Sequence, residues 1–133
     1  MNAFLKLYLI AIPVFFVLDI LWLGVVARGF YQDQIGHLLR ERVNWGAAVA
    51  FYLVFLAGVV VFVVLPAIER QSLQHALVYG ALFGLVTYAA YDLTNLAVAR
   101  DWPLAVTVVD MAWGAVLTAT VSGVTYWLAN RLH

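Results

Sequence analysis

The sequence predicts an all-α, integral membrane four-helix bundle that forms a single domain over residues 1–133. Of the 133 residues 66% are hydrophobic and 11% are charged, whereas soluble domains contain about 45–50% apolar and about 25% charged residues. A soluble fold this small could not bury so much apolar surface. Four apolar stretches also reach the length of about 20 residues that a membrane helix needs, at about residues 3–27, 46–65, 73–99 and 104–129.

The first stretch, residues 3–27, is expected to remain in the protein as a membrane helix. Asp19 interrupts its apolar run, no convincing small-residue cleavage site follows, and Arg28 closes the stretch. These features do not fit a cleaved signal peptide, which needs a short apolar core and such a site.

The ends of the other three stretches are marked by proline and by charged residues. Pro66 and the polar run of residues 69–72 are predicted to end the second span. Residues 100–103 form a tight turn between the third and fourth spans, and Pro103 suits a first helical position. The second span offers only Tyr52 as a polar side chain, so we expect it to be a brace that faces mostly lipid.

The connection of residues 28–45 is expected to contain a short amphipathic helix at the membrane interface. Tyr31, Ile35, Leu38 and Leu39 recur at helical spacing, and polar residues occupy the other side. Such helices lie in the plane of the interface with their apolar face toward the acyl chains. The segment could act as a lid or serve only as a connector.

A weak internal repeat relates the two halves of the chain. The segment "LDILWLGVVAR" (18–28) resembles "YDLTNLAVAR" (91–100), and "NWGAAV" (44–49) resembles "DWPLAV" (101–106). The pattern indicates two duplicated helical hairpins in parallel orientation. Chance similarity between apolar sequences is the alternative.

Three acidic residues lie inside the predicted spans at one depth. Asp19 precedes Arg28 by nine positions, Asp92 precedes Arg100 by eight, and Asp110 follows the 100–103 turn. At about 1.5 Å per residue, each carboxyl lies roughly 12–13 Å inward from the same membrane face. A charged group in hydrocarbon costs at least about 2.5 kcal/mol, and the spans carry no basic residue at that depth. We therefore expect the three acids to face one another in the bundle interior.

The residues near these acids in the sequence indicate that the first, third and fourth helices form a polar interior. Gly80 and Gly84 form a G-x-x-x-G pair, which lets another helix approach closely. Trp22 and Trp113 each follow an aspartate by three residues, so that an indole N–H could donate to a carboxylate. The predicted polar intramembrane cluster is Asp19, Trp22, Tyr88, Asp92, Asn95, Asp110 and Trp113, and the predicted helix-packing residues are Gly80, Gly84 and Gly114.

Carboxyl groups that share a low-dielectric site cannot all be ionised, so the cluster should titrate as a coupled unit. Such a unit can relay protons, hold a cation or bind an amine. Alternatively, each protonated aspartate could only lock the helices together by hydrogen bonds. We expect no metal. The acids have no companion histidine at their depth for zinc, and magnesium or calcium would need further oxygen ligands and water beside the three carboxylates. We expect no cofactor, because the sequence shows no haem ligand pair and no phosphate-binding loop.

The motifs "DILWLG" (19–24), "GFYQDQIG" (29–36), "FY" (51–52), "YGALFGLVTYAAYDLTNLA" (79–97) and "DMAWG" (110–114) resemble a bacterial membrane protein family, domain of unknown function 2177 (DUF2177). The resemblance covers nearly the whole chain. It implies a multi-pass protein of the bacterial inner (cytoplasmic) membrane and no established activity. It points to the same Asp19, Asp92, Asn95 and Asp110.

Three functions fit these observations. The first is a site that binds or transports protons or a small cationic or polar solute, and the small volume enclosed by four helices then favours a homodimer with a contact at Gly80 and Gly84. The second is an accessory subunit beside another membrane protein. The third is a membrane-embedded enzyme for a lipid or isoprenoid, with an aspartate as general acid or base. The lipid bilayer is the expected partner, and the zero net charge gives no reason to expect nucleic acid.

Overall fold

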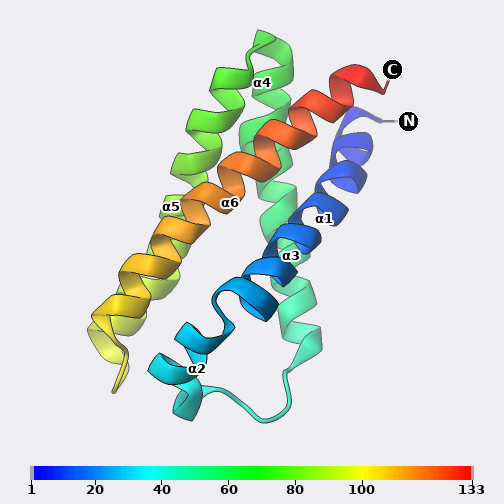
Figure 1. Ribbon diagram of the computed structural model, residues 1–133. Helices are drawn as coiled ribbons and strands as arrows, with labels where there is room; N and C mark the ends of the chain where they lie inside the picture. Colours follow the sequence, from blue (N-terminus) through cyan, green and yellow to red (C-terminus); the bar gives the residue numbers. More distant parts are fainter. Residues whose placement is uncertain (1, 133) are drawn as a thin grey trace.

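The computed structural model describes residues 2–132 and shows four long helical spans joined by short connections (Figure 1). Each span is long and apolar enough to cross a membrane, which confirms the predicted fold class. The first span is α1 (Ala3–Leu21) with the π-helical segment η1 (Trp22–Val26). The second is α3 (Trp45–Val59), the π-helical η3 (Val60–Val64) and α4 (Leu65–Arg70), and the third and fourth are α5 (Leu73–Val98) and α6 (Leu104–Arg131).

Side chains of polar residues cap the start of three spans. The Asn2 side chain accepts a hydrogen bond from the backbone N–H of Phe4 at 2.7 Å, and Asn44 accepts one from Ala47 at 3.1 Å. Ser72 does the same for His75 at 3.0 Å. Each cap satisfies a backbone donor that the first turn of a helix leaves free, so the sequence itself sets these helix starts.

The second span is longer than the sequence predicted, because the helix continues past Pro66 to Arg70. A proline inside a regular α-helix removes one hydrogen bond and clashes with the carbonyl four residues before it. Here the wider π turns of η3 come directly before α4, and Pro66 lies in the first turn of α4, where its missing N–H costs little. The helix ends instead at Gln71, whose φ of 52° is left-handed.

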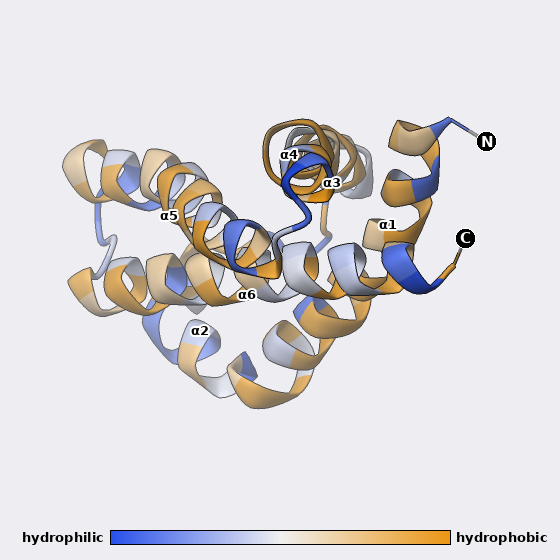
Figure 2. Ribbon diagram, turned by 90° about the horizontal axis from the view of Figure 1, so that it is seen from above, coloured by the Kyte–Doolittle hydropathy of each residue, from blue (hydrophilic) through white to orange (hydrophobic). Residues whose placement is uncertain are grey.

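The chain termini lie at the same end of the bundle as the turn between α4 and α5 (Figure 1). The opposite end holds the short helices α2 (Arg28–Ile35) and η2 (Gly36–Leu38) together with the turn between α5 and α6. The predicted short helix between the first two spans is therefore present. Hydrophilic residues gather in these connections and apolar residues cover much of the spans (Figure 2).

Helices α5 and α6 pack along their length through small residues. A Cβ atom at Gly80 would lie 2.8 Å from the Ser122 hydroxyl oxygen and 2.9 Å from the Thr118 carbonyl oxygen. A Cβ at Gly84 would collide with the Gly114 carbonyl oxygen. Both glycines are buried inside the chain, so the contact between two copies that the sequence suggested at this pair is wrong.

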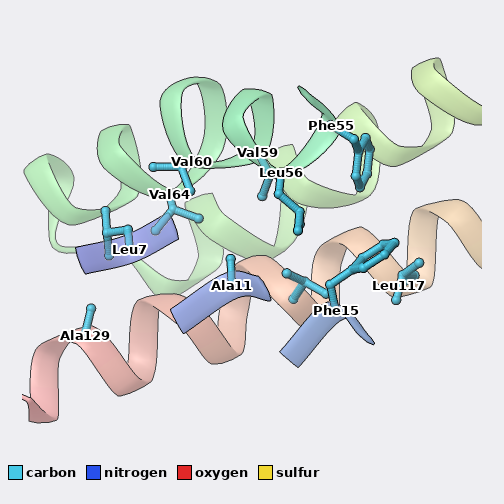
Figure 3. Close-up of a cluster of buried hydrophobic side chains, with 11 residues drawn as sticks. Leu7, Ala11, Phe15, Phe55, Leu56, Val59, Val60, Val64, Leu117 and Ala129 are labelled. Atoms are coloured by element: carbon cyan, nitrogen blue, oxygen red, sulfur yellow. The ribbon is translucent and has the colours of Figure 1, made fainter. Parts of the chain in front are cut away.

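The apolar core lies between α1, the second span and α6 (Figure 3). Leu56 and Val60 of the second span are fully buried against Phe15 of α1 and Leu117 of α6. The prediction that the second span mostly faces lipid is therefore wrong for the face that supplies the core within residues 55–67, whereas Val54 and Phe62 do point outward. An apolar face toward lipid and an apolar face toward a neighbouring helix carry the same residue types, so sequence pattern cannot separate them.

The two hairpins that the sequence relates by duplication pack differently. Helices α5 and α6 lie against each other, whereas α1 makes most of its contacts with α6 and few with α3.

We predict that Gly84→Ala lowers the free energy of unfolding by about 1–3 kcal/mol, because the added methyl group must push α5 away from α6. Thermal or denaturant unfolding of the purified protein in detergent measures this change. Gly24→Ala is the matched control, since a Cβ at Gly24 meets no atom of the described chain within 4 Å. Equal stability of the two variants would contradict the close helix contact.

Candidate functional site

A cavity of about 350 Å³ lies inside the bundle and has walls from all four spans; we call it the central pocket. Its polar walls are Asp19, Tyr52, Thr87, Tyr88, Tyr91 and Asp110. Its apolar walls are Leu23, Ala48, Phe51 and Trp113. Within residues 2–132 no lysine, arginine or histidine lines it. Two acidic groups thus face an aromatic cavity with no basic side chain among its lining residues.

Asp19 and Asp110 face the central pocket from opposite helices, and each accepts a hydrogen bond from an aromatic residue. Asp19 of α1 is buried, and its Oδ1 accepts from the Trp113 indole Nε1 at 3.4 Å. Asp110 of α6 is only partly buried, and its Oδ1 accepts from the Tyr31 hydroxyl at 2.7 Å. The prediction that Asp110 is buried is wrong, because this residue borders cavities on two sides.

The two tryptophans that the sequence singled out stack on each other between the acids. Their ring centroids are 4.4 Å apart and their planes differ by 8°. Trp113 donates to Asp19, which lies on another helix, and the Trp22 Nε1 donates to the Tyr31 hydroxyl at 3.1 Å. Trp22 begins the π-helical η1 segment, whose wider turns alter the direction of side chains relative to a regular helix. The indoles thus join Asp19 to Asp110 through Tyr31.

The predicted cluster lacks four residues of the site: Tyr31, which bonds to Asp110, and the pocket walls Tyr52, Thr87 and Tyr91. Tyr31 lies on α2, outside the spans, and its hydroxyl donates to Asp110 while it accepts from Trp22. Burial raises the pKa of the Tyr31 phenol, so the hydroxyl stays protonated as a donor near neutral pH. One feature of the sequence could have identified Tyr31. Among the apolar residues that recur at helical spacing in segment 28–45, it is the one that carries a polar group.

A second cavity, which we call the outer pocket, lies beneath α2 and has a volume of about 340 Å³. Arg28, Tyr31 and Gln32 of α2 line it, together with Trp102 of the turn between α5 and α6. Leu23, Tyr91 and Asp110 line both the outer and the central pocket. Asp110 therefore stands at the boundary between a pocket near the end of the bundle and a pocket inside it.

A third cavity, the side groove, lies between the second span and α5 and has a volume of about 550 Å³. Val54, Ala57, Phe62 and Phe83 are among its apolar walls. Phe51 and Thr87 line both the side groove and the central pocket. The central pocket therefore adjoins, at these two residues, an apolar groove on the flank of the bundle.

Asp92 lies close to the other acids but outside the pockets. Its side chain is fully buried, and neither carboxyl oxygen has a hydrogen-bond partner among the described residues. Asp110 is the acidic group that interacts with it. Two carboxyl groups can bond to each other only when one of them holds a proton. The three acids thus form a chain from Asp19 across the pocket to Asp110 and on to Asp92, and they do not meet in one cavity.

The remaining predicted residues divide into two groups. Tyr88 lines the central pocket, and its ring packs directly on Gly114, which explains the small residue there. Asn95 is partly buried and lies outside the central and outer pockets. In the part of the chain that the structure describes, no three histidine or acidic side chains are grouped so that they could hold a metal ion.

These features define the chain as a multi-pass membrane protein that has a polar, aromatic pocket inside a helical bundle. The chain belongs to the family described as predicted membrane protein (DUF2177), which matches residues 4–127. The family resemblance seen in the sequence is thereby confirmed. No curated protein and no solved structure matches the chain.

We predict that Asp92→Asn raises the free energy of unfolding by about 1 kcal/mol. The amide keeps the shape of the side chain and can donate to Asp110, which relieves an unpartnered buried group. Denaturant unfolding in detergent measures the change, and Asp33→Asn on the exposed side of α2 is the control. A loss of stability in Asp92→Asn would show that the carboxyl itself holds the helices together.

We predict that Tyr31→Phe lowers the free energy of unfolding by about 1–3 kcal/mol at neutral pH, because it removes a hydrogen bond to a carboxyl group. Because the pKa of Tyr31 is raised in the fold, wild-type stability should fall above about pH 10, where the unfolded chain loses the phenol proton first. Tyr31→Phe should show a smaller fall. Unfolding curves at several pH values test this, with the exposed Tyr79→Phe as control; identical curves for both variants would contradict it.

Proposed function

We propose that the protein binds protons or a small cationic or polar solute in the central pocket and moves them into or through a bacterial inner membrane. The observation that carries the proposal is the pair of carboxyl groups, Asp19 and Asp110, that face one cavity whose described lining contains no basic residue. A proton or a cation is the species that such a pair attracts in a low-dielectric setting.

The hydrogen bonds around the pair suit this role. Trp113 donates to Asp19 and Tyr31 donates to Asp110, so each carboxyl receives one donor and keeps other lone pairs free for a ligand. The aromatic donors stay neutral and cannot neutralise the acids. A cation or proton would supply the missing positive charge.

The position of Asp110 supports movement as well as binding. It lines both the central pocket and the outer pocket, and the outer pocket lies under α2 near the end of the bundle. A solute that enters beneath α2 would meet Asp110 first and then Asp19. In this proposal Tyr31 holds α2 over the site as a lid, because its hydroxyl ties that helix to Asp110.

The side groove favours a second candidate function, a membrane-embedded enzyme for a lipid or isoprenoid. The groove adjoins the central pocket at Phe51 and Thr87, so a long apolar substrate could approach the acids from the side. Asp19 or Asp110 would then act as general acid or base. The third hypothesis, an accessory subunit in which the acids only lock the helices, expects a solid bundle, and the cavities argue against it.

We predict that the wild-type protein in lipid nanodiscs binds guanidinium or tetramethylammonium in the central pocket. Asp19→Asn and Asp110→Asn should each weaken this binding about tenfold, which corresponds to about 1.4 kcal/mol. Tryptophan fluorescence reports binding, because Trp113 lines the pocket.

The control is Asp33→Asn, which removes an exposed acid of α2. Binding that is equally strong in Asp33→Asn and in the two pocket variants would count against the proposed function. A liposome assay with a pH-sensitive dye inside the vesicles then separates proton movement from binding alone.

A further inference from the structure

The side groove opens toward the surroundings of the bundle at the middle of the spans. Val54 is 72% exposed and Phe62 is 67% exposed, although both side chains line the groove. Side chains of this kind on a membrane span contact acyl chains. A molecule in the groove would therefore come from the bilayer and would carry an apolar chain.

The central pocket has the composition of a site for an organic cation. The aromatic residues Tyr52, Tyr88, Tyr91 and Trp113 line the same pocket as the two carboxyl groups. Aromatic cages recognise alkylated ammonium groups through cation–π attraction, and nearby carboxylates add the opposite charge. A phosphate-bearing headgroup would need a basic partner, and the described lining of this pocket offers none.

The two cavities adjoin at Phe51 and Thr87, which line both of them. Asp92 also lacks a binding partner. Its fully buried carboxyl lies beside Asp110 and has no hydrogen-bond partner within residues 2–132. A positive charge in the central pocket would stabilise the acids together.

We propose that the ligand is an amphipathic organic cation, which places an alkylated ammonium head between Asp19 and Asp110 and an apolar chain in the side groove. It enters sideways from the bilayer between the second span and α5. This inference rests on the proposed function of the central pocket. It adds the class of solute and gives that solute a lateral route in place of entry beneath α2. It excludes a bare metal ion and an anionic lipid as the preferred ligand.

The test compares three probes on the protein in nanodiscs: dodecyltrimethylammonium, tetramethylammonium and the uncharged dodecanol. Binding is measured by tryptophan fluorescence, and empty nanodiscs correct for partition into the lipid. We expect dodecyltrimethylammonium to bind at least tenfold more tightly than either other probe, because only this probe fills both cavities. Asp19→Asn should weaken its binding about tenfold.

Ala57→Phe fills the side groove, and Ala50→Phe places the same ring on the exposed part of α3 outside the three cavities. We expect Ala57→Phe to weaken dodecyltrimethylammonium binding at least fivefold and to leave tetramethylammonium binding unchanged, with no effect of Ala50→Phe. Phe62→Ala, which truncates an exposed groove wall, is a second variant and should also weaken binding of the long-chain probe.

Three results would overturn the inference, and they are distinguishable from one another. If guanidinium and tetramethylammonium bind through Asp19 but the dodecyl chain adds no affinity, the side-entry inference fails and the proposed function stands. If no cation binds in a way that depends on Asp19 or Asp110, both fail. Equal loss of long-chain binding in Ala57→Phe and Ala50→Phe also overturns the role of the groove.

Discussion

The backbones of α5 and α6 come into contact where Gly84 of one helix meets the carbonyl of Gly114 on the other. Inside a bilayer, apolar side chains gain little by leaving lipid for protein, so close packing of small residues becomes a main source of helix association. This contact fixes the register of the two helices. The register places Asp92 beside Asp110 and the Tyr88 ring on Gly114. The part of the site that α5 and α6 form therefore depends on this contact.

The first span completes the site from the other side. Phe15 packs in the core with Leu56 and Leu117, and one turn further along α1 Asp19 reaches the central pocket. The stacked tryptophans then link the first span to α6 and, through Tyr31, to α2. Polar groups inside a membrane protein are costly, and here the hydrogen bonds leave both pocket carboxyls without a positive partner among the described residues. A binding site would retain carboxyl groups that have no positive partner, whereas side chains with a purely structural role would avoid this cost.

The acidic residues show how far sequence reasoning reached into the site. Helix geometry alone placed Asp19, Asp92 and Asp110 at one depth, and the structure joins them in a chain. It could not say which of them would face a cavity, because that depends on the rotation of each helix about its axis. Nor could it find Tyr31: an aromatic residue on an amphipathic connector is expected at the interface, and only the folding of α2 over the end of α6 brings its hydroxyl to Asp110.

The sequence by itself determined the number of spans and most of their ends, because these follow from apolar length and capping residues. The tertiary structure alone decided that the second span belongs to the core, that the glycine pair is used within the chain, and that the tryptophans and the acids pair across helices. The physical reason is that lipid and a protein interior are both apolar. Residue type therefore shows that a face avoids water, and only packing shows what that face touches.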